Sequence, residues 1–370
     1  MMNKPRTGVL GWLSRLDWPL LVVVAVLAAL GLYNLRSAAT HSPAAFHLIQ
    51  SGWFVLGLCM VVVMAVIHTR VFMRSAYVFY GAVILLLLIV AVAGTELNGS
   101  KRWLNLGVFL MQPSELLKLA VILVTARYFQ DRNKESSYRL RDLVVPFALL
   151  GVGVGFVVSQ PDLGTSLVIV AIFMTMVLFE GVRWESLLGL ALAVMVALPF
   201  AYSFGLKDYQ KARVVSFINI EADAQGQSWQ VRQSIIAFGS GRVWGKGHVE
   251  GTQVQKGFVP EHENDFIAAN WAEERGFMGM LFLLAVYLAF IACALNVSRK
   301  ARDRFGVQIG VGVAALFFWH VVVNLGMVTG VLPVVGLTLP LMSYGGSSLL
   351  TMLAGVGLLL NVSAHRGNFH

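Results

Sequence analysis

The sequence predicts an all-α polytopic membrane protein with about ten transmembrane helices, and three observations support that prediction. Hydrophobic residues make up 57% of the chain and charged residues 13%, whereas charged residues average about 25% in soluble domains. Apolar stretches of about 20 residues, the length that crosses the hydrocarbon core of a bilayer, recur along the chain. The short segments between them are rich in Lys and Arg, as is typical of polytopic membrane proteins.

Ten apolar stretches qualify as spans. The first one follows several basic residues, and its length favours a retained helix over a cleavable signal peptide. The expected spans run approximately over Pro19–Leu35, His47–Ile67, Ser75–Gly94, Pro113–Phe129, Leu143–Ser159, Leu163–Phe179, Ser186–Phe204, Glu273–Asn296, Gly306–Thr329 and Gly345–Val362.

The distribution of Lys and Arg orients these spans. If successive segments alternate between the two sides, the short segments of one side carry sixteen Lys or Arg residues, and those of the other side carry only Arg36, Lys101 and Arg102. The positive side is cytoplasmic, so both termini are expected in the cytoplasm. The segment 205–271, between the seventh and eighth spans, is then one long extracytoplasmic loop within a single transmembrane domain of residues 1–370. Helical spacing predicts an amphipathic piece in this loop at Trp229–Phe238.

Charge and cysteine content argue against several other classes of protein. The formal net charge is +9, but the basic residues lie mostly in short loops, which suits anionic lipid head groups rather than nucleic acid. Cys59 and Cys293 lie in apolar runs and are typical of small core residues. The histidines lack zinc-ligand spacing, and His320, inside a span, is expected to be a hydrogen-bonded interior residue. We therefore predict no metal-ligating residues and no nucleic-acid partner.

A cluster of acidic residues occupies the end of the long loop and the start of the eighth span. The range Gly257–Gly279 holds five carboxylates: Glu261, Glu263, Asp265, Glu273 and Glu274. Charge beside a bilayer is costly to hold, so such a cluster needs a reason. Glu273 and Glu274 lie at the expected entrance of the eighth span, where helix-dipole and interfacial roles fit them. By itself, Asp265 fits a helix-capping or solvated loop carboxylate as well as a functional one.

The loop before the fourth span combines basic, aromatic and acidic residues. Lys101 and Arg102 beside Trp103 either anchor the chain at the head groups or bind a lipid phosphate. Glu115 and Lys118 lie three residues apart, so they share a helix face and can form an ion pair. An ion pair within a span usually faces a bundle interior or a watery cavity. The pair is therefore either a structural staple or part of a cavity lining.

Three further segments interrupt the apolar pattern. QPDLGTS places Asp162 in a tight turn where it can cap the next helix. Gly239–Gly247 does not match the pattern of a phosphate-binding loop, and is either a structural turn or a close approach of backbone to a ligand or the membrane. Thr329–Ser348, which contains Ser343, is too apolar for a solvated loop and too broken for a helix. Irregular backbone of this kind is tolerated where it is buried in protein or lines a cavity.

Together these motifs resemble the SEDS family of RodA and FtsW. The matching stretches are GSKRWLNLG…QPSELLK, QPDLGTS, GSGRVWGKG…FVPEHENDFIAANWAEERGFMG and LPVVGLTLPLMSYGGSS, in the order found in the family. The compact termini and YQKARVVSFIN…QSWQVRQSIIAFGSG are more similar to RodA than to FtsW. Arg242, Trp244, Asn264 and Arg275 depart from the family pattern, but none of them replaces a motif carboxylate.

The resemblance implies a peptidoglycan glycosyltransferase. Such an enzyme polymerises lipid II into glycan strands on the outer face of the cytoplasmic (inner) membrane, for cell elongation and rod shape. Asp265 matches the essential loop aspartate of the family, and we predict that it is the general base that accepts a proton from the attacking sugar hydroxyl. Glu115, Lys118, Asp162 and Ser343 are expected to support the cavity beneath it, as are Glu273 and Glu274.

The departing lipid pyrophosphate develops negative charge, which cations would stabilise. The candidate substrate-binding residues on the outer side are Lys101, Arg102, Trp103, Lys211, Arg213, Arg242 and Lys246. A divalent cation could assist departure, although the sequence assigns it no ligands. The resemblance also implies a partner, a class B penicillin-binding protein with transpeptidase activity, together with the elongation machinery.

Two other classes of function remain open at this stage. Interior ionisable groups and a broken apolar segment are also found in flippases and secondary transporters of lipid-linked precursors. No inverted repeat of spans, which would favour transport, is visible in the sequence. A purely scaffolding membrane protein is the third class, and it leaves the carboxylate-rich outer loop unexplained.

Overall fold

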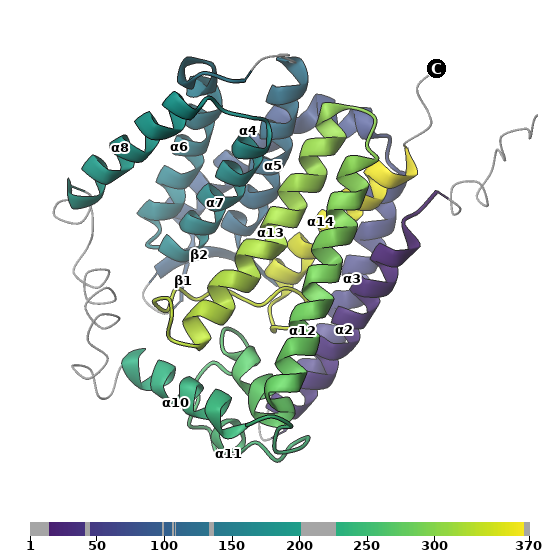
Figure 1. Ribbon diagram of the computed structural model, residues 1–370, viewed down its shortest axis with the longest axis vertical. Helices are drawn as coiled ribbons and strands as arrows, with labels where there is room; N and C mark the ends of the chain where they lie inside the picture. The colour runs from purple at the N-terminus through teal and green to yellow at the C-terminus, as the bar shows by residue number, and fades with distance from the viewer. Residues whose placement is uncertain are drawn as a thin grey trace, which may run out of the picture.

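The computed structural model describes residues 15–40, 45–97, 100–105, 107, 109–132, 137–200 and 227–365. Within them the chain is mostly helical, and long helices lie side by side in one bundle (Figure 1). The helices are α2 (Trp18–Ala38), α3 (Phe46–Val66), α4 (Thr69–Ala93), α5 (Pro113–Asp131), α6 (Val144–Ser159), α7 (Leu163–Phe179), α8 (Trp184–Phe200), α10 (Gln227–Ser240), α11 (Thr252–Gln255), α12 (Ile267–Arg299), α13 (Arg304–Val328) and α14 (Gly346–Ala364).

Each of the ten predicted spans overlaps a helix, and residues 201–204 of the seventh span lie outside the described residues. Seven helical segments in the described part of the chain are long and apolar enough to cross a membrane: α2, α3, α4, α6 with the 3-10 turn before it, α12, α13 and α14. α7 and α8 are shorter apolar helices, and α5 carries Glu115, Lys118, Arg127 and Asp131 along its length. A polytopic membrane protein is therefore confirmed, whereas the number of ten crossings stays a prediction.

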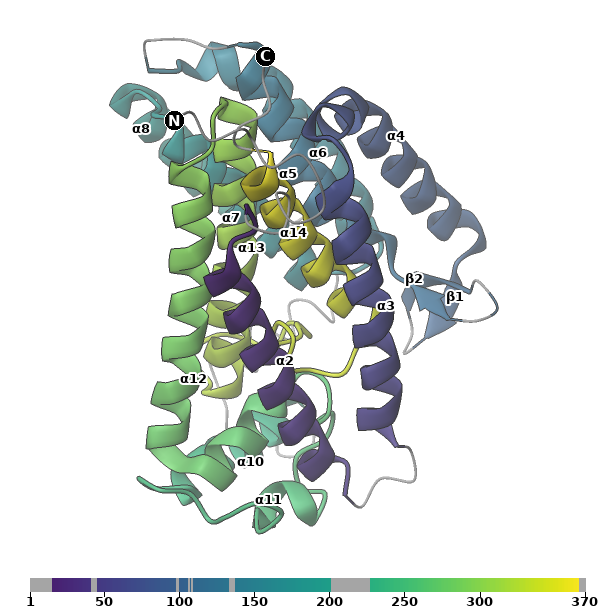
Figure 2. The ribbon, with the colours of Figure 1, turned by 90° about the vertical axis from the view of Figure 1, so that its right-hand side faces the viewer.

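The predicted orientation requires both termini at one end of the bundle and the long loop at the other. α2 begins and α14 ends at the upper end of the bundle, while α10 and α11 lie at the lower end (Figure 2). The predicted amphipathic piece forms α10, with Val231 and Ala237 buried and Trp229 and Ile236 exposed. The first part of the predicted loop, residues 205–226, lies outside the described residues.

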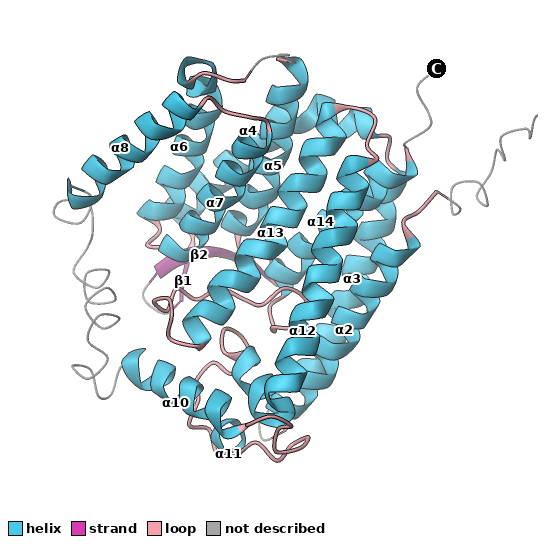
Figure 3. Cartoon of the chain, in the orientation of Figure 1, coloured by secondary structure: helices cyan, strands magenta, loops and turns pink. Residues whose placement is uncertain are grey.

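A small antiparallel sheet, which the all-α prediction lacked, closes the segment between α4 and α5. It consists of β1 (Thr95–Leu97), β2 (Ser100–Asn105) and β3 (Leu110–Met111), in the order β1-β2-β3 (Figure 3). β1 and β3 are too short to show an alternating pattern, and the six residues of β2, SKRWLN, do not alternate between polar and apolar. The sheet determines where Lys101, Arg102 and Trp103 stand, since all three lie on β2.

The helices differ strongly in how much of their surface the protein covers. In α14, 89% of the most apolar 18-residue window is buried, and in α13 67%, compared with 22–28% in α2, α3 and α4. A helix that is apolar all round belongs in the core of a bundle, whereas the outer helices turn exposed Val, Leu and Ile side chains outwards. α13 and α14 are thus the central helices of the bundle.

α12 is interrupted at Gly276, where φ is +63° and ψ is −162°. The Gly-rich turn repairs the break: Lys246 N and Gly247 N donate to the carbonyls of Glu273 and Glu274, at 3.0 and 3.2 Å. In return, Phe277 N and Met278 N donate to the carbonyls of Arg242 and Val243, at 2.8 and 3.0 Å. Backbone groups freed by a kink need such partners in a membrane protein. Gly239–Gly247 is therefore a structural turn that pairs with the broken helix.

We expect Gly276→Ala to destabilise the protein, because a Cβ there would lie 2.4 Å from Gly245 N and the residue would keep a positive φ. Strained backbone of this kind costs about 1 to 3 kcal/mol. Thermal unfolding of the purified protein in detergent measures the loss. Gly239→Ala is the control, since a Cβ on Gly239 meets nothing within 4 Å. Equal melting temperatures for the two variants would contradict the role assigned to the kink.

Candidate functional site

Residues 329–345 form an irregular connection between α13 and α14, as the sequence of Thr329–Ser348 predicts, and Gly346 to Ser348 begin α14. This irregular segment is held by side chains from several helices: the hydroxyl of Tyr287 donates to Pro340 O at 2.7 Å, and the amide of Gln50 donates to Ser343 O at 3.0 Å. Ser343 is buried, and its Oγ accepts from Leu339 N at 2.8 Å, which closes a turn. The second part of the connection, Leu337 and Leu339–Ser343, is buried in protein, as irregular backbone within a membrane requires, whereas Val331 and Gly336 are exposed.

Asp265 lies where the long loop meets this segment. It is half-buried in the turn that leads into α12, and its main-chain carbonyl accepts from Asn324 Nδ2 at 2.8 Å. Its carboxylate lies against Gly336, where an added Cβ would stand 3.3 Å from Oδ2 and where φ is +69°. A glycine at this position lets the carboxylate lie beside bare backbone.

The loop and the segment meet at a second point as well. Tyr344 N donates to Glu263 O at 2.9 Å. The turn that carries Asp265 is thus joined to the irregular segment on both sides.

Glu115 and Lys118 form the ion pair that their spacing predicts. Lys118 Nζ lies 2.8 Å from Glu115 Oε1, and the two side chains are 0% and 7% exposed. Lys118 Nζ also lies 2.8 Å from Nε2 of His320, whose Nδ1 lies 3.1 Å from Thr338 O. A carbonyl can only accept and an ammonium can only donate, so these partners select the neutral ring with its proton on Nδ1. His320 is the hydrogen-bonded interior residue expected from the sequence.

Asp162 caps α7, as its place in QPDLGTS predicts. Its Oδ1 accepts from Thr165 N at 3.3 Å, and its Oδ2 accepts from the amide of Gln112 at 3.1 Å. Arg102 reaches the same turn from β2: Nε donates to Gln160 O at 2.9 Å, and Nη1 lies 3.9 Å from Asp162 Oδ1. Arg102 therefore links the small sheet to the start of α7, while Lys101 beside it is exposed and Trp103 is half-buried.

Glu273 is a buried carboxylate that organises the loop rather than its own helix. Its oxygens accept from the main-chain N–H groups of Thr252 and Gln253, at 2.8 and 3.0 Å, which begin α11. Lys246 Nζ completes the site at 2.6 Å from Oε1. α12 begins at Ile267, and Glu273 lies inside it just before the kink that precedes its long straight part, so a role in the dipole of the eighth span stays a prediction, while its hydrogen bonds go to α11. The favourable dipole is that of α11.

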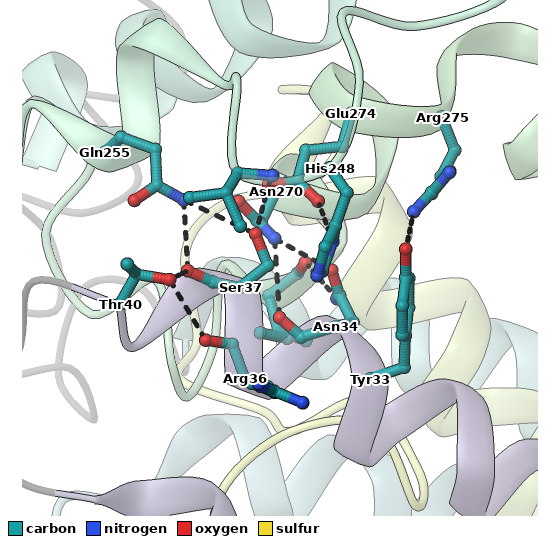
Figure 4. Close-up of polar contacts among 12 residues, drawn as sticks. Tyr33, Asn34, Arg36, Ser37, Thr40, His248, Gln255, Asn270, Glu274 and Arg275 are labelled. Carbon is teal, nitrogen blue, oxygen red and sulfur yellow. Dashed lines mark hydrogen bonds and ion pairs between the residues drawn. The ribbon is translucent and has the colours of Figure 1, made fainter.

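Glu274 anchors the end of α2 to α12. It accepts from Ser37 Oγ and from Val249 N, the latter at 2.9 Å, and lies 3.3 Å from Nδ1 of His248 (Figure 4). Glu274 is 2% exposed, so its carboxylate acts within the protein, and its expected interfacial place stays a prediction. Further contacts across the same two helices are the Asn270 amide to Asn34 Oδ1 at 2.8 Å and Arg275 over the ring of Tyr33 at 5.0 Å.

The basic residues predicted to bind substrate divide into three groups. Lys101 and Arg242 are exposed. Arg102 and Lys246 are engaged with the protein, through Asp162 and Glu273 respectively. Lys211 and Arg213 lie outside the described residues. Across the described ranges, no group of three or more His, Cys, Asp or Glu side chains could hold a metal ion.

Sequence reasoning missed one residue of this site. Asn324 lies on α13, is fully buried and contacts both Asp265 and the irregular segment. An amide within an otherwise apolar stretch of a span is a signal that could have found it, because a polar group at that depth needs partners.

Comparisons with known proteins agree with this architecture. The model of the FtsW, RodA and SpoVE family of cell cycle proteins matches residues 12–368. The chain is similar to the peptidoglycan glycosyltransferase MrdB of Escherichia coli K12, with 39% identity over 316 residues and 85% of each chain covered. It is also similar to a probable peptidoglycan glycosyltransferase FtsW of Trichlorobacter lovleyi, with 34% identity over 95% of this chain and 94% of the relative.

Two solved structures share the fold. One is a chain of a peptidoglycan synthase complex that coordinates polymerization and crosslinking, with a TM-score of 0.83, 36% identity, and 96% of this chain and 99% of that chain covered. The other is the rod shape determining protein RodA of Thermus thermophilus, with a TM-score of 0.70, 32% identity, and 95% and 97% covered. The chain therefore belongs to the FtsW, RodA and SpoVE family of multi-pass membrane proteins.

Proposed function

We propose that this protein is a peptidoglycan glycosyltransferase that polymerises lipid II on the outer face of the cytoplasmic membrane, for cell elongation and rod shape. The observation that carries the proposal is the position of Asp265. Its main chain is held by Asn324 of the central helix α13, and its carboxylate lies beside Gly336 in the irregular segment. Family membership supports the same activity, since relatives at 39% and 34% identity bear this name.

Asp265 acts as the general base in this proposal. Glycan extension requires a sugar hydroxyl to lose its proton while its oxygen attacks the anomeric carbon of the second substrate. A carboxylate within hydrogen-bonding distance accepts that proton. The new glycosidic bond forms as the bond to the lipid pyrophosphate breaks, and attack from the opposite face inverts the anomeric centre. The half-buried position of Asp265 limits water around the carboxylate while leaving it accessible.

The leaving pyrophosphate carries the negative charge that develops in the reaction. Exposed cationic side chains stabilise this charge most readily when no protein carboxylate already neutralises them. Lys101 and Arg242 fit that requirement better than Lys246, whose ammonium lies 2.6 Å from Glu273. We therefore assign pyrophosphate binding to Lys101 and Arg242, and a structural role to Lys246 and Arg102.

The Glu115–Lys118 pair supports the site from within the bundle. Lys118 connects through His320 to Thr338 O, two residues after the glycine that faces Asp265. Removing one member of a buried pair leaves the other charge without compensation in a medium of low dielectric. The pair therefore stabilises the irregular segment that carries one wall of the site.

The proposal includes a partner that crosslinks the new strand, a class B penicillin-binding protein. One similar chain is part of a peptidoglycan synthase complex that coordinates polymerization and crosslinking, which supports such a partnership. The alternative activity, flipping or transport of a lipid-linked precursor, predicts no glycan product. The product of the purified protein therefore separates the two.

We expect Asp265→Asn to abolish polymerisation of lipid II by the purified protein in detergent. The amide keeps the size of the side chain but cannot accept the proton, and loss of a general base costs about 10²- to 10⁴-fold in rate. Glycan length and yield are measured by gel electrophoresis of labelled product. Glu250→Gln is the matched control, because Glu250 is an exposed carboxylate of the same loop. Undiminished polymer from Asp265→Asn would contradict the role of Asp265 as general base. Absence of glycan from the wild-type protein would favour the alternative activity, flipping or transport of a lipid-linked precursor.

Lys118→Met is expected to destabilise the protein by about 3 to 5 kcal/mol, as breaking a buried ion pair does. Thermal unfolding measures the effect, and the double variant Glu115→Gln/Lys118→Met should recover part of it. The control on the same helix is Arg127→Met, which removes a pair with Asp131 that is 26% and 43% exposed. Exposed pairs contribute about 1 kcal/mol or less. A similar loss in the two single variants would contradict a buried, uncompensated charge.

A further inference from the structure

Asn324 presents a polar amide inside one of the most buried helices of the protein. Its side chain is 0% exposed, and its neighbours along α13 are apolar on both sides. An unpaired amide in such a place costs several kcal/mol by transfer arguments, about 2 to 7. Both of its N–H groups are in fact used, and the identity of their acceptors shows what the amide does.

Asn324 Nδ2 donates to two main-chain carbonyls of distant segments. One is Asp265 O at 2.8 Å and the other is Leu337 O at 2.6 Å. Both partners are acceptors only, so the amide nitrogen, not the amide oxygen, must face them. One side chain of the central helix thus joins the turn that carries Asp265 to the irregular segment.

The second segment is the one against which the Asp265 carboxylate lies. Leu337 directly follows Gly336, whose added Cβ would stand 3.3 Å from Asp265 Oδ2. One helical turn before Asn324, His320 holds the next carbonyl, Thr338 O, at 3.1 Å. Residues four apart share a helix face, so α13 fixes two successive carbonyls of the segment. Asn324 also binds Asp265 O, so it sets the distance between the turn that carries Asp265 and the irregular segment.

We propose that Asn324 is a positioning residue that fixes the carboxylate of Asp265 relative to the backbone at Gly336 and Leu337. The inference rests on the proposed role of Asp265 as general base. Asn324 is fully buried, and it acts through its bonds to the main chain of Asp265 and of Leu337. A displacement of about 1 Å at a reacting group can lower the rate about 10²-fold, so loss of this bond should affect turnover more than substrate binding.

A purely structural amide elsewhere in the bundle provides a matched control. Asn361 on α14 is 1% exposed, and its Nδ2 donates to Met64 O at 2.8 Å and to Ile67 O. Both carbonyls belong to the end of α3, and Asn361 Oδ1 also accepts from Thr69 Oγ1 at 2.7 Å, so this amide joins α14 to the end of α3 and the start of α4. It lies near the end of α14 that is far from the irregular segment (Figure 2). Removing either amide leaves two carbonyls without a donor.

The experiment compares Asn324→Leu with Asn361→Leu in full-length protein purified in detergent. Rates of lipid II polymerisation are normalised to the fraction that elutes as a single folded species. We expect Asn324→Leu to lower kcat about 10- to 100-fold with KM within about threefold, and Asn361→Leu to keep kcat within about threefold at a similar loss of melting temperature. If Asn324→Leu does not fold, Asn324→Ser takes its place, because the serine side chain is too short to reach the two carbonyls and changes the core less.

The pH profile of kcat provides a readout that folding alone does not move. The rate falls on the acidic side as the general base is protonated, and a displaced carboxylate has a different environment and hence a different pKa. We expect the midpoint of the acidic limb to shift by about half a unit or more in the Asn324 variant, and to stay unchanged in Asn361→Leu, since the fraction of folded protein scales the whole curve.

Asp265→Asn in the same assay separates this inference from the proposed function. If Asp265→Asn still makes polymer, the function proposed for Asp265 fails. If Asp265→Asn is inactive while Asn324→Leu keeps the kcat and acidic limb of Asn361→Leu, only the positioning role is overturned. The positioning role is supported if the Asn324 variant, and not Asn361→Leu, shows a reduced kcat and a shifted acidic limb of the pH profile.

Discussion

The requirement that every main-chain polar group find a partner inside the protein shapes this molecule more than any single contact. Water satisfies such groups at the surface of a soluble protein, but not in the hydrocarbon core of a bilayer. In the described part of the chain, two interior departures from regular helix are at Gly276 and in residues 329–345. At Gly276 the Gly-rich turn replaces the lost helical bonds. At Thr329–Ser348 the side chains of Tyr287, Gln50, His320 and Asn324 bind the free carbonyls.

Both departures converge on the carboxylate-rich stretch. The kink at Gly276 ends the first part of α12, so Glu273 and Glu274 lie in a short helical section outside the long straight part of the helix. There they bind the beginning of α11 and the end of α2. Asp265, at the other end of the same section, is held against the irregular segment. One rigid piece of helix therefore has structural carboxylates at its C-terminal end and the proposed base just before its first residue.

This arrangement explains why the basic residues that the sequence suggests for substrate binding are not equivalent. Lys246 and Arg102 lie beside carboxylates that cap helices, so their charge is used within the protein. Pairing with a buried carboxylate holds a cation in one position and satisfies its hydrogen bonds. A cationic side chain that binds a phosphate must instead be accessible from solvent, as Lys101 and Arg242 are. A buried carboxylate partner, rather than the type of basic residue, therefore distinguishes Lys246 and Arg102 from Lys101 and Arg242.

Sequence alone determined the membrane class, the helical nature of all ten apolar stretches, the Glu115–Lys118 pair and the cap at Asp162. These features follow from local rules: apolar length, side chains three apart on one helix, and an aspartate before a helix. Local rules did not reveal the three short strands, the start of α12 at Ile267, or the partners of Glu273 and Glu274. The tertiary structure alone decided those, as it decided that Asn324 joins Asp265 to Leu337, 59 and 13 residues away in the chain. Residues so far apart meet only when the fold brings them together, and no pattern within a single span encodes that meeting.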